Sequence, residues 1–229
     1  MFFSKIVLCP DVTDITKLSQ ALRGDGYFVH QKLWNMLASP YVVERNFIYR
    51  QEEEEGGWPC FYVVSRSKPI CDDPSWHLET KPYSPKIRTG ETLTFSLRAN
   101  PVRTKRSGEK GKQARHDVIM DAKFLHKQLE AAEQDRPNRT DLIQIEGLKW
   151  LTIRAERLGF SFRNEDVRVD SYRQHHLSNR RGQASIRFSS LDYNGKLTVV
   201  DPEKFIDTLY RGIGHCKGFG CGMLLVKRL

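Results

Sequence analysis

The sequence lacks long hydrophobic runs, paired-cysteine motifs and clusters of metal-ligating residues. No stretch approaches ~18 uncharged apolar residues, so we expect no membrane-spanning helix. The apolar opening, Met1 to Leu8, has no basic segment or cleavage site and does not predict a signal peptide. The five cysteines are odd in number and form no Cys-x-x-Cys pair, which favours a reduced, cytoplasmic protein with free thiols. Because no His-x-x-x-His pair or Asp cluster occurs, we expect neither a metal nor a cofactor.

Acidic residues are also in short supply relative to basic ones. The chain has 37 Lys and Arg against 28 Asp and Glu, which gives a formal net charge of +9 and a pI near 9.4. A balance this basic favours nucleic acid or an anionic membrane as partner, and does not choose between them. The 229 residues allow one large domain or two small ones.

The first part of the chain predicts a mixed α+β unit. A short helix is expected after its cap at Asp14, and a second helix is expected to end at Pro40, with Val29, Leu33 and Met36 at helical spacing. The expected strands span residues 2–8, 46–51 and 58–66, and this second helix spans residues 27–38. The stretch up to Arg88 is weakly patterned and broken by prolines.

The second part predicts the same type of unit. Strands are expected at 91–104, 160–172, 184–188, 196–200 and 223–226, and a helix at 141–158. Asp201 followed by Pro202 predicts the start of a further helix. The order β-α-β-β-α-β is that of a ferredoxin-like fold. We therefore predict an α+β protein of two tandem ferredoxin-like (RRM-like) βαββαβ domains, residues 1–89 and 90–229. No internal sequence repeat is visible, so the duplication rests on element order alone.

Two basic stretches interrupt the second unit. The first runs from Arg98 to Arg115 with Glu109 as its only counter-charge, and the second runs from Arg173 to Arg187 without an acid. Such stretches are either solvated, mobile loops or contacts to RNA or DNA. Two arginines of the second stretch are expected at a hairpin tip, where they could clamp phosphates. The candidate contacts are Arg98, Arg103, Lys105, Arg106, Arg173, Arg180 and Arg181.

A glycine-rich run lies near the C-terminus. Five of the eleven residues from Gly212 to Gly222 are glycine. No Gly-Lys-Ser/Thr ends the run, and an apolar strand follows it where a dinucleotide fingerprint needs a helix. Alternating Gly218, Gly220 and Gly222 predict a backbone edge open to a ligand, with Lys217 as a nearby charge. The run is either a phosphate-binding loop or a packing device that lets the last strand approach the first helix.

His30 is the histidine that the helical pattern sets apart. On the predicted helix, Tyr27, His30 and Trp34 form a stripe beside the apolar face. A histidine near its unperturbed pKa can transfer a proton, and a neighbouring phenol can donate or orient. From the pattern alone, His30 is either a candidate general acid or base or a half-buried residue of an amphipathic helix.

Four segments give the chain a resemblance to a known family. They are Met1 to Lys5, the Tyr-x-x-His-Gln-x-Leu-Trp helix from Tyr27 to Trp34, the Leu-Arg-Ala-Asn-Pro segment within Phe95 to Thr104, and the glycine run up to Leu224. Together, in this order, they resemble the CasE family of CRISPR RNA-processing endoribonucleases from type I-E systems. The resemblance covers most of the chain in patches.

The resemblance implies a metal-independent endoribonuclease that cuts a CRISPR repeat RNA at the base of its stem-loop. The 2′-hydroxyl would attack the adjacent phosphate, and the product hairpin would stay bound in a targeting complex with other protein subunits. Carried over by position, the catalytic histidine is His30 and its accompanying tyrosine is Tyr27. Lys217, Gly218 and Gly220 are assigned to RNA by type and place. A non-catalytic RNA-binding subunit of the same fold is the alternative, because a pure binder needs neither Tyr27 nor His30.

Overall fold

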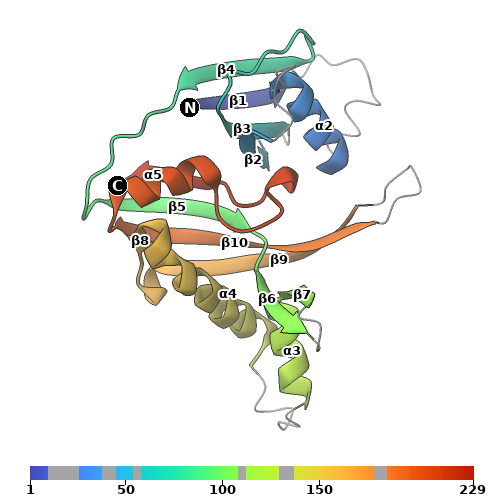
Figure 1. Cartoon of the computed structure of the whole chain (residues 1–229), viewed down its shortest axis with the longest axis vertical. Coiled ribbons are helices and arrows are strands. Elements are labelled where there is room, and N and C mark those ends of the chain that lie inside the picture. Colours follow the sequence, from blue (N-terminus) through green and yellow to red (C-terminus); the bar gives the residue numbers. More distant parts are fainter. Residues whose placement is uncertain (10–25, 38–44, 54–57, 108–111, 129–136, 178–184) are drawn as a thin grey trace.

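The computed structural model describes residues 1–9, 26–37, 45–53, 58–107, 112–128, 137–177 and 185–229. Two antiparallel sheets, of four and five strands, form the two halves of the molecule, and a separate two-stranded hairpin projects from the second half (Figure 1). The chain is thus a mixed α+β protein. No helix within these ranges is both long and apolar enough to cross a membrane.

The N-terminal sheet has the strand order β2-β3-β1-β4 with every pair antiparallel. Its strands are β1 (Phe2–Leu8), β2 (Phe47–Glu53), β3 (Pro59–Ser65) and β4 (Trp76–Pro82). Helix α2 (Gly26–Leu37) covers one face of this sheet. Its apolar stripe, with Val29 and Leu33, packs on Ile6 and Leu8 because the helical and strand periodicities turn these side chains to one core. The helix predicted at 27–38 is therefore confirmed.

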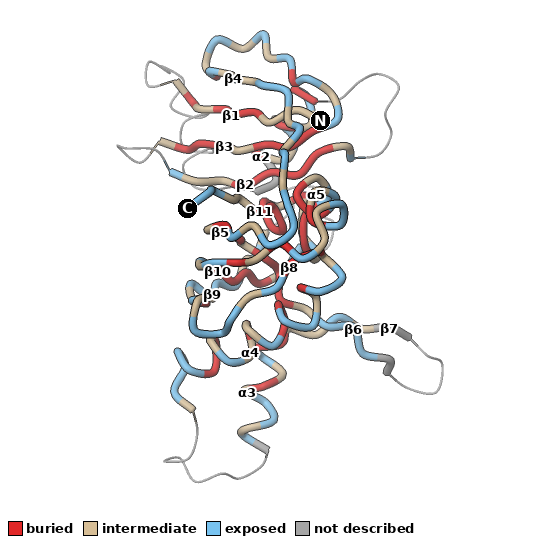
Figure 2. Tube along the Cα trace, turned by 90° about the vertical axis from the view of Figure 1, so that its left-hand side faces the viewer, coloured by how far each residue is buried: buried red, intermediate tan, exposed pale blue. Residues whose placement is uncertain are grey.

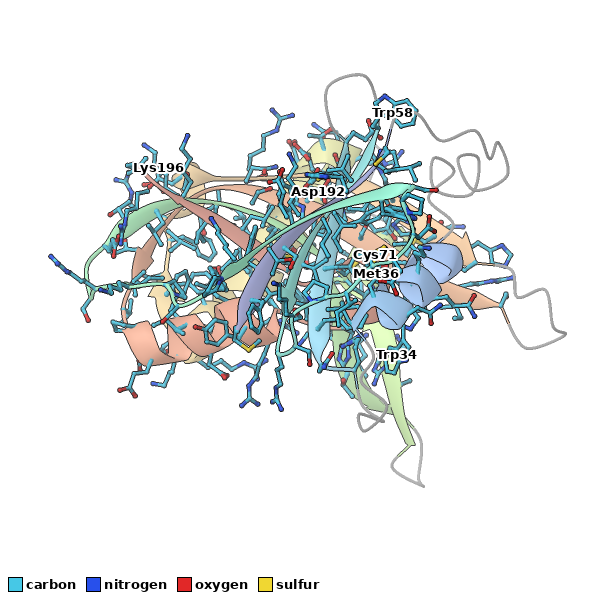
Figure 3. The ribbon with its side chains drawn as sticks, turned by 90° about the horizontal axis from the view of Figure 1, so that it is seen from above. Trp34, Met36, Trp58, Cys71, Asp192 and Lys196 are labelled. Carbon is cyan, nitrogen blue, oxygen red and sulfur yellow. The ribbon has the colours of Figure 1, made fainter. Side chains whose placement is uncertain are left out.

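Strand β4 is an element that the sequence analysis missed. Most of its residues are exposed or half-buried, and it pairs only with β1, at the edge of the sheet. An edge strand of polar residues has little hydrophobic alternation to mark it. The segment between β3 and β4 contains no helix; it returns beside α2, where the Ile70 N–H donates to the Met36 carbonyl at 2.8 Å. Seen from above, Met36 and Cys71 lie together at this packing contact (Figure 3).

The C-terminal sheet has the order β11-β5-β10-β8, with β9 also paired to β10. Its strands are β5 (Thr92–Ala99), β8 (Phe160–Ser161), β9 (Val167–Leu177), β10 (Ile186–Val199) and β11 (Leu224–Arg228). Helices α4 (Arg139–Ala155) and α5 (Pro202–Arg211) pack against it. As predicted, α5 starts with Pro202 after the Asp201 cap, which accepts from the Lys204 N–H at 3.1 Å.

Two strand predictions in this half need correction. The strand predicted at 160–172 is broken into β8 and β9 by a 3-10 turn, η3 (Asn164–Asp166). The pieces predicted at 184–188 and 196–200 belong to one strand, β10, whose centre holds the fully buried Leu191 and Tyr193. At Gly195, within this strand, a Cβ would lie 2.1 Å from the Asp166 carbonyl oxygen. This glycine therefore permits a close approach within the strand.

Much of the first basic stretch forms a two-stranded hairpin, which differs from the solvated loop that was one of its two interpretations. The strand predicted at 91–104 ends at Ala99, and the chain bends at Asn100 and Pro101. It continues as β6 (Val102–Ser107), β7 (Lys112–Asp117) and α3 (Val118–Gln128). Both strands of the hairpin are largely polar, so no alternation of apolar side chains revealed them. Figure 2 shows the β6–β7 hairpin standing away from the body of the molecule (Figure 2).

The two sheets meet across a small shared core. Ile48 and Val64 of the N-terminal sheet pack with Met223, which lies just before β11. Beside this core, Tyr210 of α5 donates a hydrogen bond to the Tyr83 carbonyl at 3.2 Å. Helix α2 lies beside the glycine run of the C-terminal half.

Candidate functional site

His30 projects from α2 towards the glycine run. Its ring is half-buried and lies 6.0 Å from Phe219, 5.9 Å from Trp34 and 6.4 Å from Phe47, measured between ring centroids. Nδ1 is buried beside the Gly218 backbone without a hydrogen bond of normal geometry among the described residues. Since the sequence separates α2 from the run by most of the chain, only tertiary packing brings these groups together.

One cation, Arg45, lies beside His30, and a second, Lys217, lies near Arg45. A Cβ on Gly218 would lie 3.0 Å from Arg45 Nη1 and 3.5 Å from His30 Cε1, so both side chains lie over this glycine. Burial, and then the charge of Arg45, hold the pKa of His30 below its ordinary value, while the Gly218 backbone opposes them. Burial, followed by repulsion from Arg45, also lowers the pKa of Lys217. The imidazole is therefore neutral at neutral pH and stands in a positively charged setting.

The glycine run does not form the open, extended edge that its alternation predicts. Lys217–Phe219 form a 3-10 turn, η4, and Gly220 and Gly222 follow with φ of +78° and +91°. The Tyr49 hydroxyl, buried in the N-terminal core, donates to the Gly218 carbonyl at 3.2 Å. Gly220 packs on the same tyrosine, because a Cβ there would lie 3.3 Å from Tyr49 Cε2. The left-handed backbone and these contacts fix the loop against His30.

A row of aromatic rings continues from the loop to the long β9–β10 ribbon. Phe219 stacks on Phe188 of β10 with centroids 5.5 Å apart, and Phe188 stacks on His175 of β9 at 4.5 Å. Burial, and then Arg98 and Arg173, lower the pKa of His175. The row links the ring of His30 to the ribbon that carries the second basic stretch.

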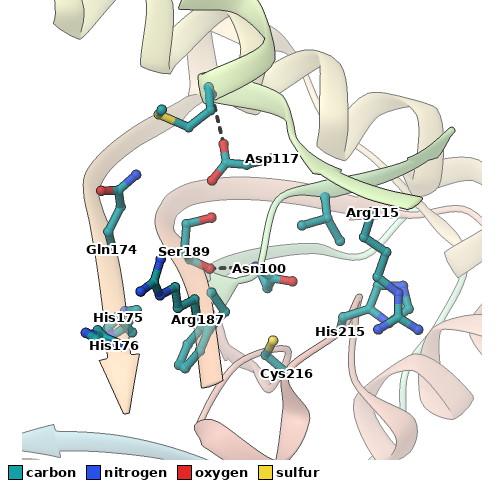
Figure 4. A pocket seen from close by; sticks show the side chains of 13 residues that line it. Asn100, Arg115, Asp117, Gln174, His175, His176, Arg187, Ser189, His215 and Cys216 are labelled. Carbon is teal, nitrogen blue, oxygen red and sulfur yellow. Dashed lines mark hydrogen bonds between the residues drawn. The ribbon is translucent and has the colours of Figure 1, made fainter. Parts of the chain in front are cut away.

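A cavity of about 570 Å³ lies between the ribbon, the β6–β7 hairpin and the glycine run (Figure 4). Most of its titratable lining is basic, and its one carboxylate, Asp117, accepts hydrogen bonds from Tyr172 and from the first turn of α3. Asn100 donates to the Ser189 carbonyl at 2.7 Å and fixes one wall. The titratable groups labelled in the figure are Arg115, Arg187, His175, His176, His215, Cys216 and Asp117.

The residues of the two basic stretches that were predicted to contact RNA, where the structure describes them, lie on β5, β6 and β9. Arg98 is half-buried and forms a two-pronged ion pair with Asp192, at 2.7 and 3.0 Å, and donates to the Gln51 carbonyl. These contacts commit its guanidinium to the protein, and its assignment to RNA stays a prediction. Arg103 and Lys105 lie on β6 and share Asp121 as partner. Arg173 is exposed on β9.

Some predicted positions cannot be placed. The backbone of Tyr27 lies in α2, one turn before His30, and that of Arg106 lies in β6, but their side chains are outside the described structure. Arg180, Arg181 and the helix expected after Asp14 also fall outside the described residues. Sequence reasoning missed Arg45, Phe219 and Tyr49, because nothing in their local pattern marks a residue that will meet a distant histidine.

Within the described ranges, no three His, Cys, Asp or Glu side chains are grouped so that they could hold a metal ion. The groups that can act on a substrate here are the neutral His30 imidazole, the Arg45 guanidinium and the glycine backbone, with Lys217 near Arg45. This set can accept a proton and neutralise a developing negative charge. Metal independence itself stays a prediction.

Comparison with known proteins identifies the class to which this fold and site belong. The chain matches the family described as CRISPR associated protein over residues 1–228, and it therefore belongs to that family. The resemblance to the CasE family is thereby confirmed. The chain is 27% identical to the CRISPR system Cascade subunit CasE of Escherichia coli (strain K12) over 231 residues, covering 100% of both chains. It is 26% identical to the CRISPR-associated endoribonuclease Cse3 of Thermus thermophilus, covering 99% of each.

Solved structures show the same fold. A structure of the endoribonuclease Cse3 bound to a 19 nt RNA superposes with a TM-score of 0.69 at 24% identity, covering 99% of this chain and 100% of that one. The Cas6e protein from Escherichia coli K-12 gives a TM-score of 0.63 at 23% identity, with both chains fully covered.

Proposed function

We propose that this chain is an endoribonuclease that cleaves CRISPR repeat RNA at the base of its stem-loop and remains on the hairpin within a Cascade-type targeting complex. The relatives named as a Cascade subunit and as an endoribonuclease support this proposal. The observation that carries it is the neutral His30 ring, packed on the glycine run beside Arg45, with Lys217 near Arg45.

The proposed reaction needs no group beyond the RNA, these side chains and solvent water. His30 takes the proton from the 2′-hydroxyl, whose oxygen attacks the adjacent phosphorus. The P–O5′ bond breaks, leaving a 2′,3′-cyclic phosphate upstream. The 5′-oxygen leaves as a hydroxyl with a proton from solvent water, to which His30 returns the proton that it took. Tyr27 positions or polarises the reacting groups from one helical turn away. Arg45 and Lys217 stabilise the charge that develops on the phosphorane oxygens.

The fold supports the binding part of the proposal. Both sheets have the strand order that βαββαβ connectivity produces, although the first lacks the helix between β3 and β4. We assign two tandem ferredoxin-like domains, residues 1–89 and 90–229, in a cytoplasmic protein. The β9–β10 ribbon, with Arg173, Arg180 and Arg181, is the surface assigned to the RNA stem. Because side chains read the deep groove of A-form RNA poorly, stem shape would govern selection.

The test is single-turnover cleavage of a repeat RNA in EDTA, with the product ends mapped. The wild type should yield a 2′,3′-cyclic phosphate or the 3′-phosphate derived from it. His30→Ala should lose at least about a hundredfold in rate while RNA affinity is retained. Tyr27→Phe, which removes only the hydroxyl, should also slow the reaction. A strict need for Mg²⁺, a 3′-hydroxyl end or a fully active His30→Ala protein would refute the mechanism, and tight binding without cleavage would identify a non-catalytic subunit.

A further inference from the structure

A second cavity, of about 360 Å³, lies on the other side of the glycine run. The end of α4 and the 3-10 turn η2 (Glu156–Leu158) form one wall, and the backbone from Gly212 to Gly214 forms the other. It shares Val102 and His215 with the larger cavity. Lys217, which approaches Arg45 beside His30, also lines it. Positive charge therefore extends from the second cavity towards the proposed active site.

Every titratable side chain that lines this cavity is basic. They are Arg154, Arg157, His215 and Lys217, and no carboxylate is among the lining residues that the structure describes. Burial first, and then Arg115, Lys217 and Arg154, lower the pKa of His215. Asp207 is the one carboxylate that acts on Lys217, and it already pairs with Arg211 at 2.7 Å. Cations held this close without counter-charges stabilise a bound anion.

Arg154 is held in place before any ligand arrives. Arg154 donates to the carbonyls of Trp150 and Val102, at 2.7 and 3.2 Å, and its guanidinium lies 4.1 Å from the centre of the Trp150 ring. Trp150 in turn donates to the Val102 carbonyl at 3.0 Å. On the opposite wall, a Cβ on Gly214 would come within 3.3 Å of the Trp150 ring, so glycine lets the loop pack close to the tryptophan. Arg154 and the Gly214 backbone are therefore fixed against the Trp150 ring.

We propose that this cavity binds a phosphodiester of the unpaired RNA that adjoins the scissile bond, an inference that rests on the proposed function. A strand whose scissile phosphate lies beside His30 and Arg45 can continue to the cavity, because Lys217 lines the cavity and lies near Arg45. The recess has room for about one nucleotide. A single strand can enter it, whereas the phosphates of a duplex lie on a convex surface. Basic grooves that follow a single-stranded backbone work in the same way.

The test measures binding of two RNAs that carry a 2′-deoxy nucleotide at the attacking position and so cannot be cleaved. One is the repeat hairpin with its unpaired flanks, and the other is the hairpin alone. Arg154→Gln/Arg157→Gln should bind the flanked RNA more weakly, with a log–log salt slope shallower by about 0.7 for each lost phosphate contact. Its affinity for the bare hairpin should equal that of the wild type. Because Arg154 also packs on Trp150, the single variant Arg157→Gln repeats the test at an exposed position.

The matched control is Arg139→Gln/Lys149→Gln, which removes two exposed charges from α4 outside the cavity. It should leave the difference between the two RNAs unchanged. An equal loss for both RNAs, or no loss, would overturn the inference, as would normal RNA binding with a failure to join other protein subunits. A wild type that neither binds nor cleaves flanked repeat RNA would refute the proposed function instead. A wild type that cleaves normally but binds the flanked RNA and the bare hairpin with equal affinity would refute only the binding site proposed in this cavity.

Discussion

At the scale of the residue, burial and then the charge of Arg45 favour the neutral form of His30. The positive charge of Arg45 disfavours the imidazolium and so lowers the pKa of His30, in addition to burial. If neutral His30 is the base, the cleavage rate falls as the pH drops through this pKa, with a midpoint below about 6.5.

Arg45→Gln should move this midpoint to higher pH, because the repulsion is removed, and should lower the plateau rate, because a cation near the phosphate is lost. The measurement is the pH profile of the single-turnover rate, with Arg66→Gln as the control at an exposed position beyond β3. A midpoint that stays fixed or moves to lower pH would contradict the assigned electrostatics.

At the scale of the element, the glycine run combines a packing role and a ligand role at different positions. Gly220→Ala places a side chain at φ +78° and against Tyr49, so it should cost about 1–2 kcal/mol in unfolding free energy from the backbone alone. That corresponds to about 2–8 °C in Tm for a chain of this size. Gly90→Ala is the matched control, with φ +80° and open space around the new methyl. Any loss of stability in Gly220→Ala beyond the loss in Gly90→Ala measures the packing of residue 220 on Tyr49.

Gly218→Ala should reduce the cleavage rate more than the thermal stability. Its φ lies outside the left-handed region, and the new methyl would meet the flexible end of Arg45 and the edge of His30. We expect a nearly native Tm and a reduced cleavage rate. A Gly218→Ala protein with native cleavage, or a Gly220→Ala protein with the thermal stability of the wild type, would contradict this division of roles.

At the scale of the whole molecule, Arg98 joins the two halves. It pairs with Asp192 of β10 and reaches the Gln51 carbonyl of β2, and both ionic side chains are largely buried, with 23% and 14% of their surface exposed. Arg98→Ala would leave Asp192 without its partner, so we expect a loss of about 2–3 kcal/mol in unfolding free energy.

The measurement is urea denaturation of Arg98→Ala, Asp192→Ala and the double variant. The double variant should lose less than the sum of the single variants, because neither charge is then left unpaired. Native stability together with weakened RNA binding in Arg98→Ala would instead assign this guanidinium to the RNA.

The sequence by itself determined the features that depend on local pattern or on composition. Apolar spacing located α2 and the position of His30 on it, Asp201 and Pro202 marked the start of α5, and the excess of basic residues indicated a polyanionic partner. Four short segments in order were enough to indicate the family. Each of these signals acts over one or two turns of helix, or over the whole composition, and needs no knowledge of distant contacts.

Tertiary structure alone decided which groups meet. Gly218 reaches His30 only because the two sheets pack together, and a glycine in a sequence does not show which side chain will lie over it. Arg45 and Phe219 join the site for the same reason, and the pairing of Arg98 with Asp192 on the neighbouring strand could not be read from the local sequence either. Edge strand β4 and the β6–β7 hairpin escaped prediction because backbone pairing, and not burial of alternate side chains, holds them in place.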